Sequence, residues 1–297
     1  MLDEALISDK IKQIKFDHLN GASQIARDAL KVLKIFVNTS KATSYIKFKE
    51  DFKKIGTYLL NARPNMAPVQ NLVAQVVYEV YSREEINLLS LKNYTISLLN
   101  TIIKQSEISM QETAKQATVI IPDSGCLATC SYSSTVCESL KKAKKQGKHF
   151  KVVVAESKVG TISYGGLLAH SLEQLDISVK VFSDNQILKY VKDVECVLVG
   201  ADSLLCDGSI INGFPTGELA VAAKQSKLPF FSVCETTKVN ILSYLGKHIN
   251  LVNGFDFVSS NLITGIITEK GVLNIDKLAD VIKEKSNFFE ILNIKSY

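Results

Sequence analysis

The sequence predicts an α/β protein in which a helical N-terminal domain precedes a mostly parallel, doubly wound sheet domain. The spacing of apolar residues changes near residue 117: before it they recur every three or four residues, and after it short apolar runs alternate with helical patterns. The first pattern is typical of helices buried on one face. The second is typical of a parallel sheet with helices on both faces. We therefore expect a helical domain over residues 1–116 and a sheet domain over residues 117–297.

The expected helices of the first domain each carry an apolar stripe. In the first helix Ile25, Ala29 and Leu33 lie on one stripe, and the segment Gly21-Ala22-Ser23 precedes it as a start signal. Pro64 and Pro68 interrupt the chain before the third helix. The spacing predicts helices over residues 22–38, 42–60, 69–81 and 85–116.

The expected strands of the second domain are short runs rich in Val and Ile, which is typical of strands buried on both faces. They cover residues 118–121, 151–155, 178–182, 196–199 and 230–233. Helical patterns lie between them over residues 134–146, 166–175, 185–190 and 216–225. A closing helix over residues 275–285 follows Gly271.

Composition and charge limit the possible function classes. The chain has 297 residues, of which 46% are hydrophobic and 22% charged, as in an ordinary globular protein. The net charge is only +5, and 30 acidic residues are interspersed with the basic ones. The charge is therefore weak evidence for nucleic-acid binding. A basic surface that helps to capture phosphorylated ligands is equally compatible. The basic run at residues 141–145 lies on an expected helix, where a solvated face is favoured over a nucleic-acid site.

The sequence also favours a cytoplasmic protein without a membrane anchor. No apolar run approaches the length of a membrane span, and the first ten residues lack the apolar core of a signal peptide. The six cysteines form no CxxC pair, and the four histidines are distant from any pair of cysteines in sequence. We expect reduced thiols, and neither a metal nor a cofactor.

Polar residues in the turns are candidates for chemistry. Asp202 follows the strand at 196–199, and we expect it, Asn212 and Lys238 at the carboxyl ends of strands, where open α/β sheets bind ligands. Asp202 is suited to proton transfer or to binding a sugar hydroxyl, or it closes a turn through backbone amides. Lys238 is suited to a phosphate, or is a surface lysine.

Two further segments are candidates for binding phosphate. Small hydroxyl residues precede the helix at 134–146, where they either cap the helix or leave its N–H groups free for an anion. Arg63 is held extended by Pro64 and is suited to bidentate phosphate binding or to a structural ion pair. The hydroxyl residues are Ser131, Ser133, Ser134 and Thr135.

A series of motifs in one order resembles the superfamily that joins the alpha, beta and delta subunits of translation initiation factor 2B with two sugar-phosphate isomerases. These are methylthioribose-1-phosphate isomerase and archaeal ribose-1,5-bisphosphate isomerase. The resemblance covers nearly the whole chain and implies a Rossmann-like second domain, a ligand pocket between the domains, and a homo-oligomer, either a dimer or a hexamer. The motifs are NGASQIARDAL, ARPNMAP, CSYSSTVCESLKKAKKQGKHFKVVVAES, VGADSLLCDGSIIN, ETTKVN and FDFVSSNLITGIITEKGVL.

The resemblance implies roles for individual residues. The catalytic aspartate of the isomerases corresponds to Asp202, whereas their catalytic cysteine aligns with Ser131, and Cys130 lies one residue earlier. A serine is a much weaker acid than a cysteine, whose ordinary pKa is about 8.5. The ligand-binding positions correspond to Gly21, Ala22, Ser23, Arg63, Ser133, Ser134, Asn212 and Lys238.

Two further positions depart from the isomerases. Their arginine before the Gly-Ala pair is replaced by Asn20, and their Asn-Lys-Ile-Gly-Thr segment reads Asn-Gly-Phe-Pro-Thr at residues 212–216. Each departure removes a cation that helps to hold a phosphate dianion.

These departures favour a non-catalytic relative of the factor 2B subunits, with a pocket for a phosphorylated sugar or nucleotide that serves regulation or assembly. A translation factor is then a possible partner. The alternative is an active aldose–ketose isomerase, in which Cys130 or a water moves the C2 proton while Asp202 handles the hydroxyl proton. A third class is an oligomeric scaffold with a vestigial pocket.

Overall fold

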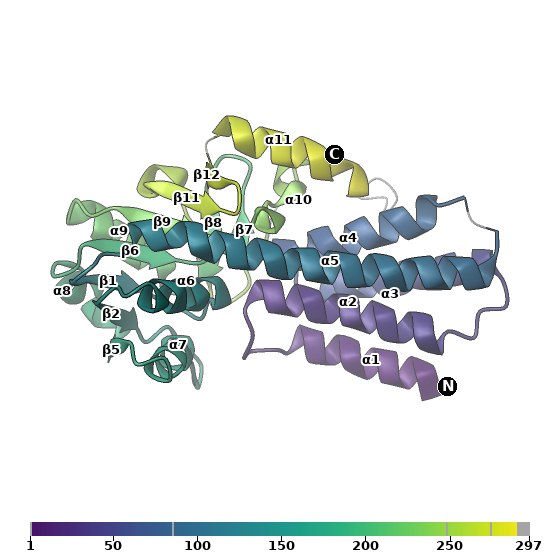
Figure 1. Cartoon of the computed structure of the whole chain (residues 1–297), viewed down its shortest axis with the longest axis horizontal. Coiled ribbons are helices and arrows are strands. Elements are labelled where there is room, and N and C mark those ends of the chain that lie inside the picture. The colour runs from purple at the N-terminus through teal and green to yellow at the C-terminus, as the bar shows by residue number, and fades with distance from the viewer. Residues whose placement is uncertain (1, 85, 248, 274, 290–297) are drawn as a thin grey trace.

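The computed structural model describes residues 2–84, 86–247, 249–273 and 275–289. Figure 1 shows a helical bundle beside a sheet layer, and one long helix, α5, that runs from the bundle across to the sheet. The bundle helices are α1 (Leu2–Lys15), α2 (Ala22–Thr39), α3 (Tyr45–Ala62), α4 (Ala67–Ser82) and α5 (Leu88–Ala117). The four expected helices are confirmed within a few residues of their bounds, although Glu85 lies outside the described residues. Helix α1 was not expected.

The bundle core follows from the apolar stripes. Ile25, Ala29 and Leu33 of α2 are fully buried, as their spacing predicts. Phe48 and Phe52, one turn apart on α3, stack at 5.8 Å between ring centroids and close the centre of the bundle. Side-chain caps mark two helix starts, because Ser44 accepts from a first-turn N–H of α3 and Asn87 does the same for α5.

The second part of the chain is built on a seven-stranded sheet with the order β12-β11-β9-β6-β1-β2-β5. All neighbouring strands are parallel except the edge pair β11–β12. Without β12, the strand order is that of the Rossmann fold, with its topological switch point between β1 and β6. The strands are β1 (Gly125–Thr129), β2 (Phe150–Ala155), β5 (Ser178–Phe182), β6 (Cys196–Val199), β9 (Phe230–Val233), β11 (Gly265–Thr268) and β12 (Gly271–Leu273).

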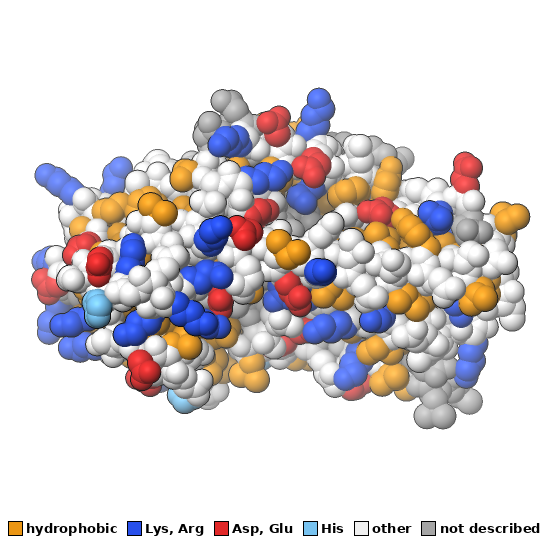
Figure 2. Space-filling model, viewed as in Figure 1, with side chains coloured by type: hydrophobic (Ala, Val, Ile, Leu, Met, Phe, Trp, Pro, Cys, Tyr) orange, Lys and Arg blue, Asp and Glu red, His pale blue; other side chains and the backbone are white. Residues whose placement is uncertain are grey.

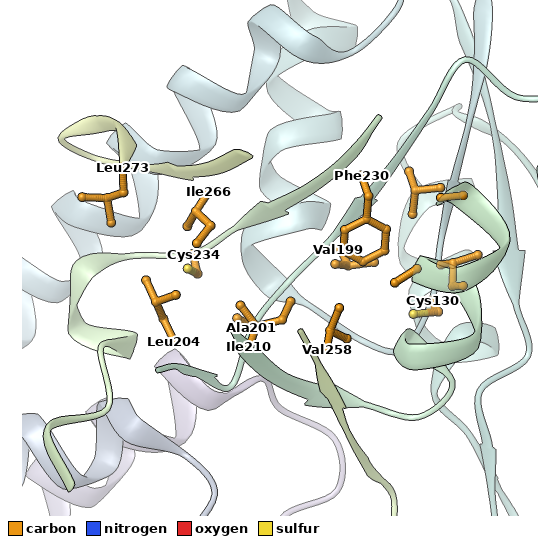
Figure 3. Packing of buried hydrophobic residues seen from close by; sticks show 14 of the residues in the cluster. Cys130, Val199, Ala201, Leu204, Ile210, Phe230, Cys234, Val258, Ile266 and Leu273 are labelled. Atoms are coloured by element: carbon orange, nitrogen blue, oxygen red, sulfur yellow. The ribbon is translucent and has the colours of Figure 1, made fainter. Parts of the chain in front are cut away.

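Helices cover both faces of this sheet, as the sequence predicts. Alternate residues of β6 point to opposite faces, since Leu198 joins one hydrophobic cluster while Val197 and Val199 join the other. The first cluster includes α6 (Ser134–Lys145), α7 (Tyr164–Glu173) and the end of α5. The second includes α8 (Ile187–Val191), α9 (Thr216–Gln225) and α11 (Ile275–Ser286). Figure 3 shows part of the second cluster, in which Val199, Phe230 and Val258 pack closely.

The strand predicted at residues 118–121 is wrong. Residues Thr118–Ile120 form a 3-10 turn that continues directly from α5, and Thr118 donates through its hydroxyl to the Lys115 carbonyl. Pro122 has no N–H to donate to a sheet, and the first strand begins only at Gly125. Strand β1 therefore ends at Thr129, immediately before Cys130 and Ser131. The other four expected strands are confirmed.

Two small antiparallel sheets complete the second part. One joins β10 (Phe255–Val258), β8 (Ile210–Gly213) and β7 (Ser203–Leu204), and the other joins β3 (Lys158–Val159) and β4 (Ile162–Ser163). Asn212 lies near the carboxyl end of β8, but this strand belongs to a small antiparallel sheet and not to the parallel main sheet. Asp202 follows β6 as predicted, and Lys238 ends the turn η3 (Thr236–Lys238) after β9.

The basic run on α6 lies at the surface, and Figure 2 shows Lys and Arg side chains over this part of the molecule. Ala143 alone in the run is buried, while Lys141 and Lys142 both approach the carboxylate of Glu138, at 3.2 and 3.9 Å. These contacts are those of a solvated helix face. Within the described residues no helix is both long and apolar enough to cross a membrane.

Candidate functional site

The site forms where the chain leaves β1 and β6, the two strands that flank the switch point. A crevice exists there because the connections from these strands run to opposite faces of the sheet. Ser131, which follows β1, and Asp202, which follows β6, both line a cavity of about 420 Å³. The opposite wall is made by the bundle, through the segment between α1 and α2 and the segment between α3 and α4.

The cavity brings together six residues that the sequence singled out. Among the lining residues that were not expected are Asp17, His18, Tyr164, Val252 and Asn253. The His18 Nδ1 and the Tyr164 hydroxyl lie 3.1 Å apart across the rim. The six expected residues are Asn20, Gly21, Ala22, Arg63, Ser131 and Asp202.

The N-terminus of α2 lies at the cavity, which Gly21 and Ala22 line. Gly21 is the N-cap and carries no side chain, so the first N–H groups of this 18-residue helix receive no side-chain cap. The start of α6 lies against it, because a Cβ on Gly21 would come within 3.2 Å of the Ser134 Oγ. Two helix N-termini therefore meet beside the cavity, and their dipoles favour negative charge in this region.

Backbone hydrogen bonds fix the position of Asp202, and its surroundings change the pKa of its carboxyl. Its N–H donates to the Ile211 carbonyl at 2.8 Å, and its carbonyl accepts from the Ala67 N–H at 3.0 Å. Burial raises the pKa of its carboxyl to about 6, although Lys238 and Arg63 both lower it. Near neutral pH this carboxyl can therefore exchange a proton, or accept hydrogen bonds from a ligand's hydroxyls.

Arg63 links the cavity to the end of α1. Its Nε donates to the Ile14 carbonyl at 2.9 Å, and one terminal nitrogen donates to the Asp17 carbonyl. Burial lowers the pKa of the guanidinium, while Asp17 and Asp202 raise it. These bonds go to backbone carbonyls and leave the remaining N–H groups of the guanidinium for the cavity that Arg63 lines.

Ser131 lines the cavity with its hydroxyl group, whereas the neighbouring thiol of Cys130 does not line it. Ser131 adopts a left-handed backbone (φ 59°), donates through its N–H to the Ser157 Oγ at 2.6 Å, and packs its side chain on Gly213. Cys130 points into the hydrophobic core (Figure 3), where its Sγ lies 3.2 Å from the Thr216 Oγ1. Burial raises the pKa of this thiol to about 12, which keeps it protonated.

Ser133, Asn212 and Lys238 were also expected at the site, but their side chains do not line the cavity. Ser133 accepts from the Val136 N–H and so caps α6, which is the structural alternative considered for it. Asn212 donates through its amide to the Thr216 Oγ1 at 2.9 Å. Lys238 is only 4% exposed, and its Nζ lies 3.9 Å from the Glu235 carboxylate.

Glu235 is the central polar residue that the sequence reading missed. Its carboxylate is 1% exposed and accepts from the Ser23 Oγ and the Thr135 Oγ1, both at 2.9 Å. It therefore joins the first turns of α2 and α6 to the end of β9. Its position directly after a buried strand, in the ETTKVN motif, was the available signal. Across the described residues, no three His, Cys, Asp or Glu side chains gather as a metal site would require.

Comparisons with known proteins agree with this architecture. The model of the initiation factor 2 subunit family matches residues 18–251. The chain is 30% identical to an eIF-2B subunit 2-like translation initiation factor of Pyrococcus furiosus (92% of this chain, 98% of that one). It is 28% identical to ribose 1,5-bisphosphate isomerase of the same organism (94% and 93%). The tetrameric eIF2B-beta2-delta2 complex from C. thermophilum superposes with a TM-score of 0.78 at 18% identity, covering 95% of each chain.

Proposed function

The chain belongs to the initiation factor 2 subunit family, and within it we propose that this protein is a non-catalytic subunit that binds a phosphorylated sugar or nucleotide. The cavity between the bundle and the sheet is the ligand site. The observation that carries the proposal is the pairing of an anion-binding end, at the start of α2 and Arg63, with a wall that lacks a reactive thiol.

Phosphate binding is supported by the donors at one end of the cavity. Uncapped N–H groups at the start of α2 and the guanidinium of Arg63 are the groups that hold phosphate dianions in proteins. A sugar or ribose is supported by Asp202, which in its ionised form accepts hydrogen bonds from ligand hydroxyls. The cavity volume of about 420 Å³ suits a small phosphorylated molecule.

Absence of turnover is supported by the chemistry of residues 130 and 131. Isomerisation of an aldose phosphate requires a group that moves the C2 proton while a second group handles the hydroxyl proton. Asp202 can fill one of these roles. For the other, the cavity offers the Ser131 hydroxyl, whereas the neighbouring thiol of Cys130 is buried away from it.

An active isomerase is the second candidate, and the titration of Asp202 favours it. A carboxyl with a pKa of about 6 is suited to accept and return a proton near neutral pH. A relative of similar length, ribose 1,5-bisphosphate isomerase, supports the same candidate.

Assembly belongs to the same proposal. Similarity to the chains of a tetrameric complex supports a homo-oligomer or a place in a larger assembly, with a translation factor as partner. Size-exclusion chromatography with light scattering measures this directly. A monomer at micromolar concentration would contradict it.

Proton NMR with ribose 1,5-bisphosphate, and separately with methylthioribose 1-phosphate, decides between binding and turnover. We expect ligand-dependent line broadening and no ketose. Appearance of the ketose would establish an isomerase. Ser131→Cys, which places a thiol on the cavity wall, is the matched variant: a gain of turnover in this variant alone supports the proposal, because it shows that the pocket lacked only the thiol.

A further inference from the structure

A second, larger cavity of about 1060 Å³ forms a groove between α1 and α3, beside the end of α2. Its apolar floor includes Ile7, Ile11 and Ile55, and lysines surround it. We refer to it as the lysine groove.

The lysine groove is continuous with the candidate site. Lys15, Asn61 and Ala62 line both cavities. From this shared end the groove follows α3 back to Lys47, a distance of about 20 Å at the rise of an α-helix. A ligand seated in the candidate site can therefore extend an arm past Lys15 without leaving a lined surface.

The charge of the groove is strongly one-sided. Lys47, Asp51 and Lys54 recur at helical spacing on the face of α3 that lines it. Asp51 is the single carboxylate among the described lining residues, and Lys47 already pairs with it at 2.8 Å. Lys12, Lys15 and Lys54 thus meet no carboxylate within the lining, so a multiply charged anion fits the groove.

We propose that the lysine groove holds the polyphosphate arm of a ligand whose first phosphate and sugar occupy the candidate site. This inference rests on the proposed function and narrows its ligand to a nucleoside polyphosphate. The order of cations supports that arrangement: Arg63 and the start of α2 lie in the candidate site, Lys15 at the shared end, and Lys12 and Lys54 within the groove.

Isothermal titration with adenosine mono-, di- and triphosphate tests the groove. We expect the affinity to rise by about tenfold from the monophosphate to the triphosphate, as charge-assisted hydrogen bonds are added. In the double variant Lys12→Gln/Lys54→Gln the gain should disappear, while the affinity for the monophosphate stays unchanged. Both lysines are exposed, so the fold should persist, which a melting curve checks. Lys31→Gln is the control, since Lys31 is exposed on α2 and lines neither cavity.

Equal affinities for the three nucleotides, or a gain that survives in the double variant, would overturn the groove assignment while leaving the proposed function intact. Inorganic tripolyphosphate that binds as tightly as the triphosphate would also overturn it, because the sugar would then contribute nothing. If neither the nucleotides nor ribose 1,5-bisphosphate bind, the proposed function fails together with the groove.

Discussion

The bundle and the sheet contribute opposite chemistry to the cavity they share. The bundle supplies Arg63 and the backbone donors at the start of α2, which attract an anion. The sheet supplies the Asp202 carboxyl and the Ser131 hydroxyl, which can exchange a proton or bind a sugar hydroxyl. Phosphate binding and proton transfer thus rest on different parts of the chain. The proposed function requires that the first is kept while the second is lost.

Buried polar contacts fix the two parts relative to each other. Ser23 of α2 donates to Glu235 beyond β9, and the Asn71 amide of α4 donates to the carbonyls of Thr237 and Val239. In the other direction, the Ser203 hydroxyl donates to the Asn65 carbonyl. The shape of the cavity therefore depends on side chains that do not line it.

The largest expected effect comes from Glu235→Gln, which breaks the junction between the two parts. Glutamine can still accept from one of the Ser23 and Thr135 hydroxyls and can donate to the other, but it leaves the buried Lys238 ammonium without its carboxylate. We expect the free energy of unfolding to fall by about 3 kcal/mol, measured by chemical denaturation.

A double-mutant cycle with Lys238→Met separates charge from packing. If the pair is coupled, Glu235→Gln/Lys238→Met should be more stable than Glu235→Gln alone. Glu138→Gln on the solvated face of α6 is the control, with an expected change below about 0.5 kcal/mol. Strictly additive losses would show that the Lys238–Glu235 contact contributes nothing.

Arg63→Ala comes next and tests the wall supplied by the bundle. Loss of a charge-assisted contact to phosphate should weaken binding of ribose 1,5-bisphosphate by about 10- to 100-fold, measured by titration calorimetry. Arg83→Ala removes the same charge from the end of α4, away from the cavity, and should leave the affinity unchanged. Equal affinities for the wild type and Arg63→Ala would show that Arg63 only ties down the end of α1.

The sequence predicted the fold class and singled out six of the residues that line the cavity, because the patterns that mark them are local. Apolar runs of four or five residues marked the buried strands, and Asp202 lies three residues after the end of one of them. The wrong prediction of a strand at residues 118–121, in place of β1, also has a physical cause. The run before Pro122 has the higher strand propensity, but it continues the last turn of α5, and the true strand is selected by parallel pairing with β2 and β6.

The orientation of polar side chains could not be predicted in the same way. The Lys238 ammonium lies beside the Glu235 carboxylate, and the Asn212 amide donates to the Thr216 hydroxyl. Neither side chain therefore lines the cavity. Ser23 and Glu235 are separated by 212 residues, and no periodic pattern links positions so distant in sequence. They meet because the start of α2 lies beside the end of β9 in the folded chain.

The smallest expected effect, from Asp202→Asn, tests the wall supplied by the sheet. Because folding raises the pKa of Asp202 from 3.8 to about 6, the folded protein holds this proton more tightly than the unfolded chain. The group's contribution to stability is therefore complete below about pH 4 and is lost as the pH rises through about 6. Because the Asp202 residue is only partly buried, we expect a loss of about 1–2 kcal/mol over that range, below the value for full burial. The Asn variant lacks this loss, so its stability relative to the wild type should increase with pH in denaturation curves. A pH-independent difference would mean that Asp202 titrates as an ordinary carboxyl, which would remove the observation that favours an isomerase.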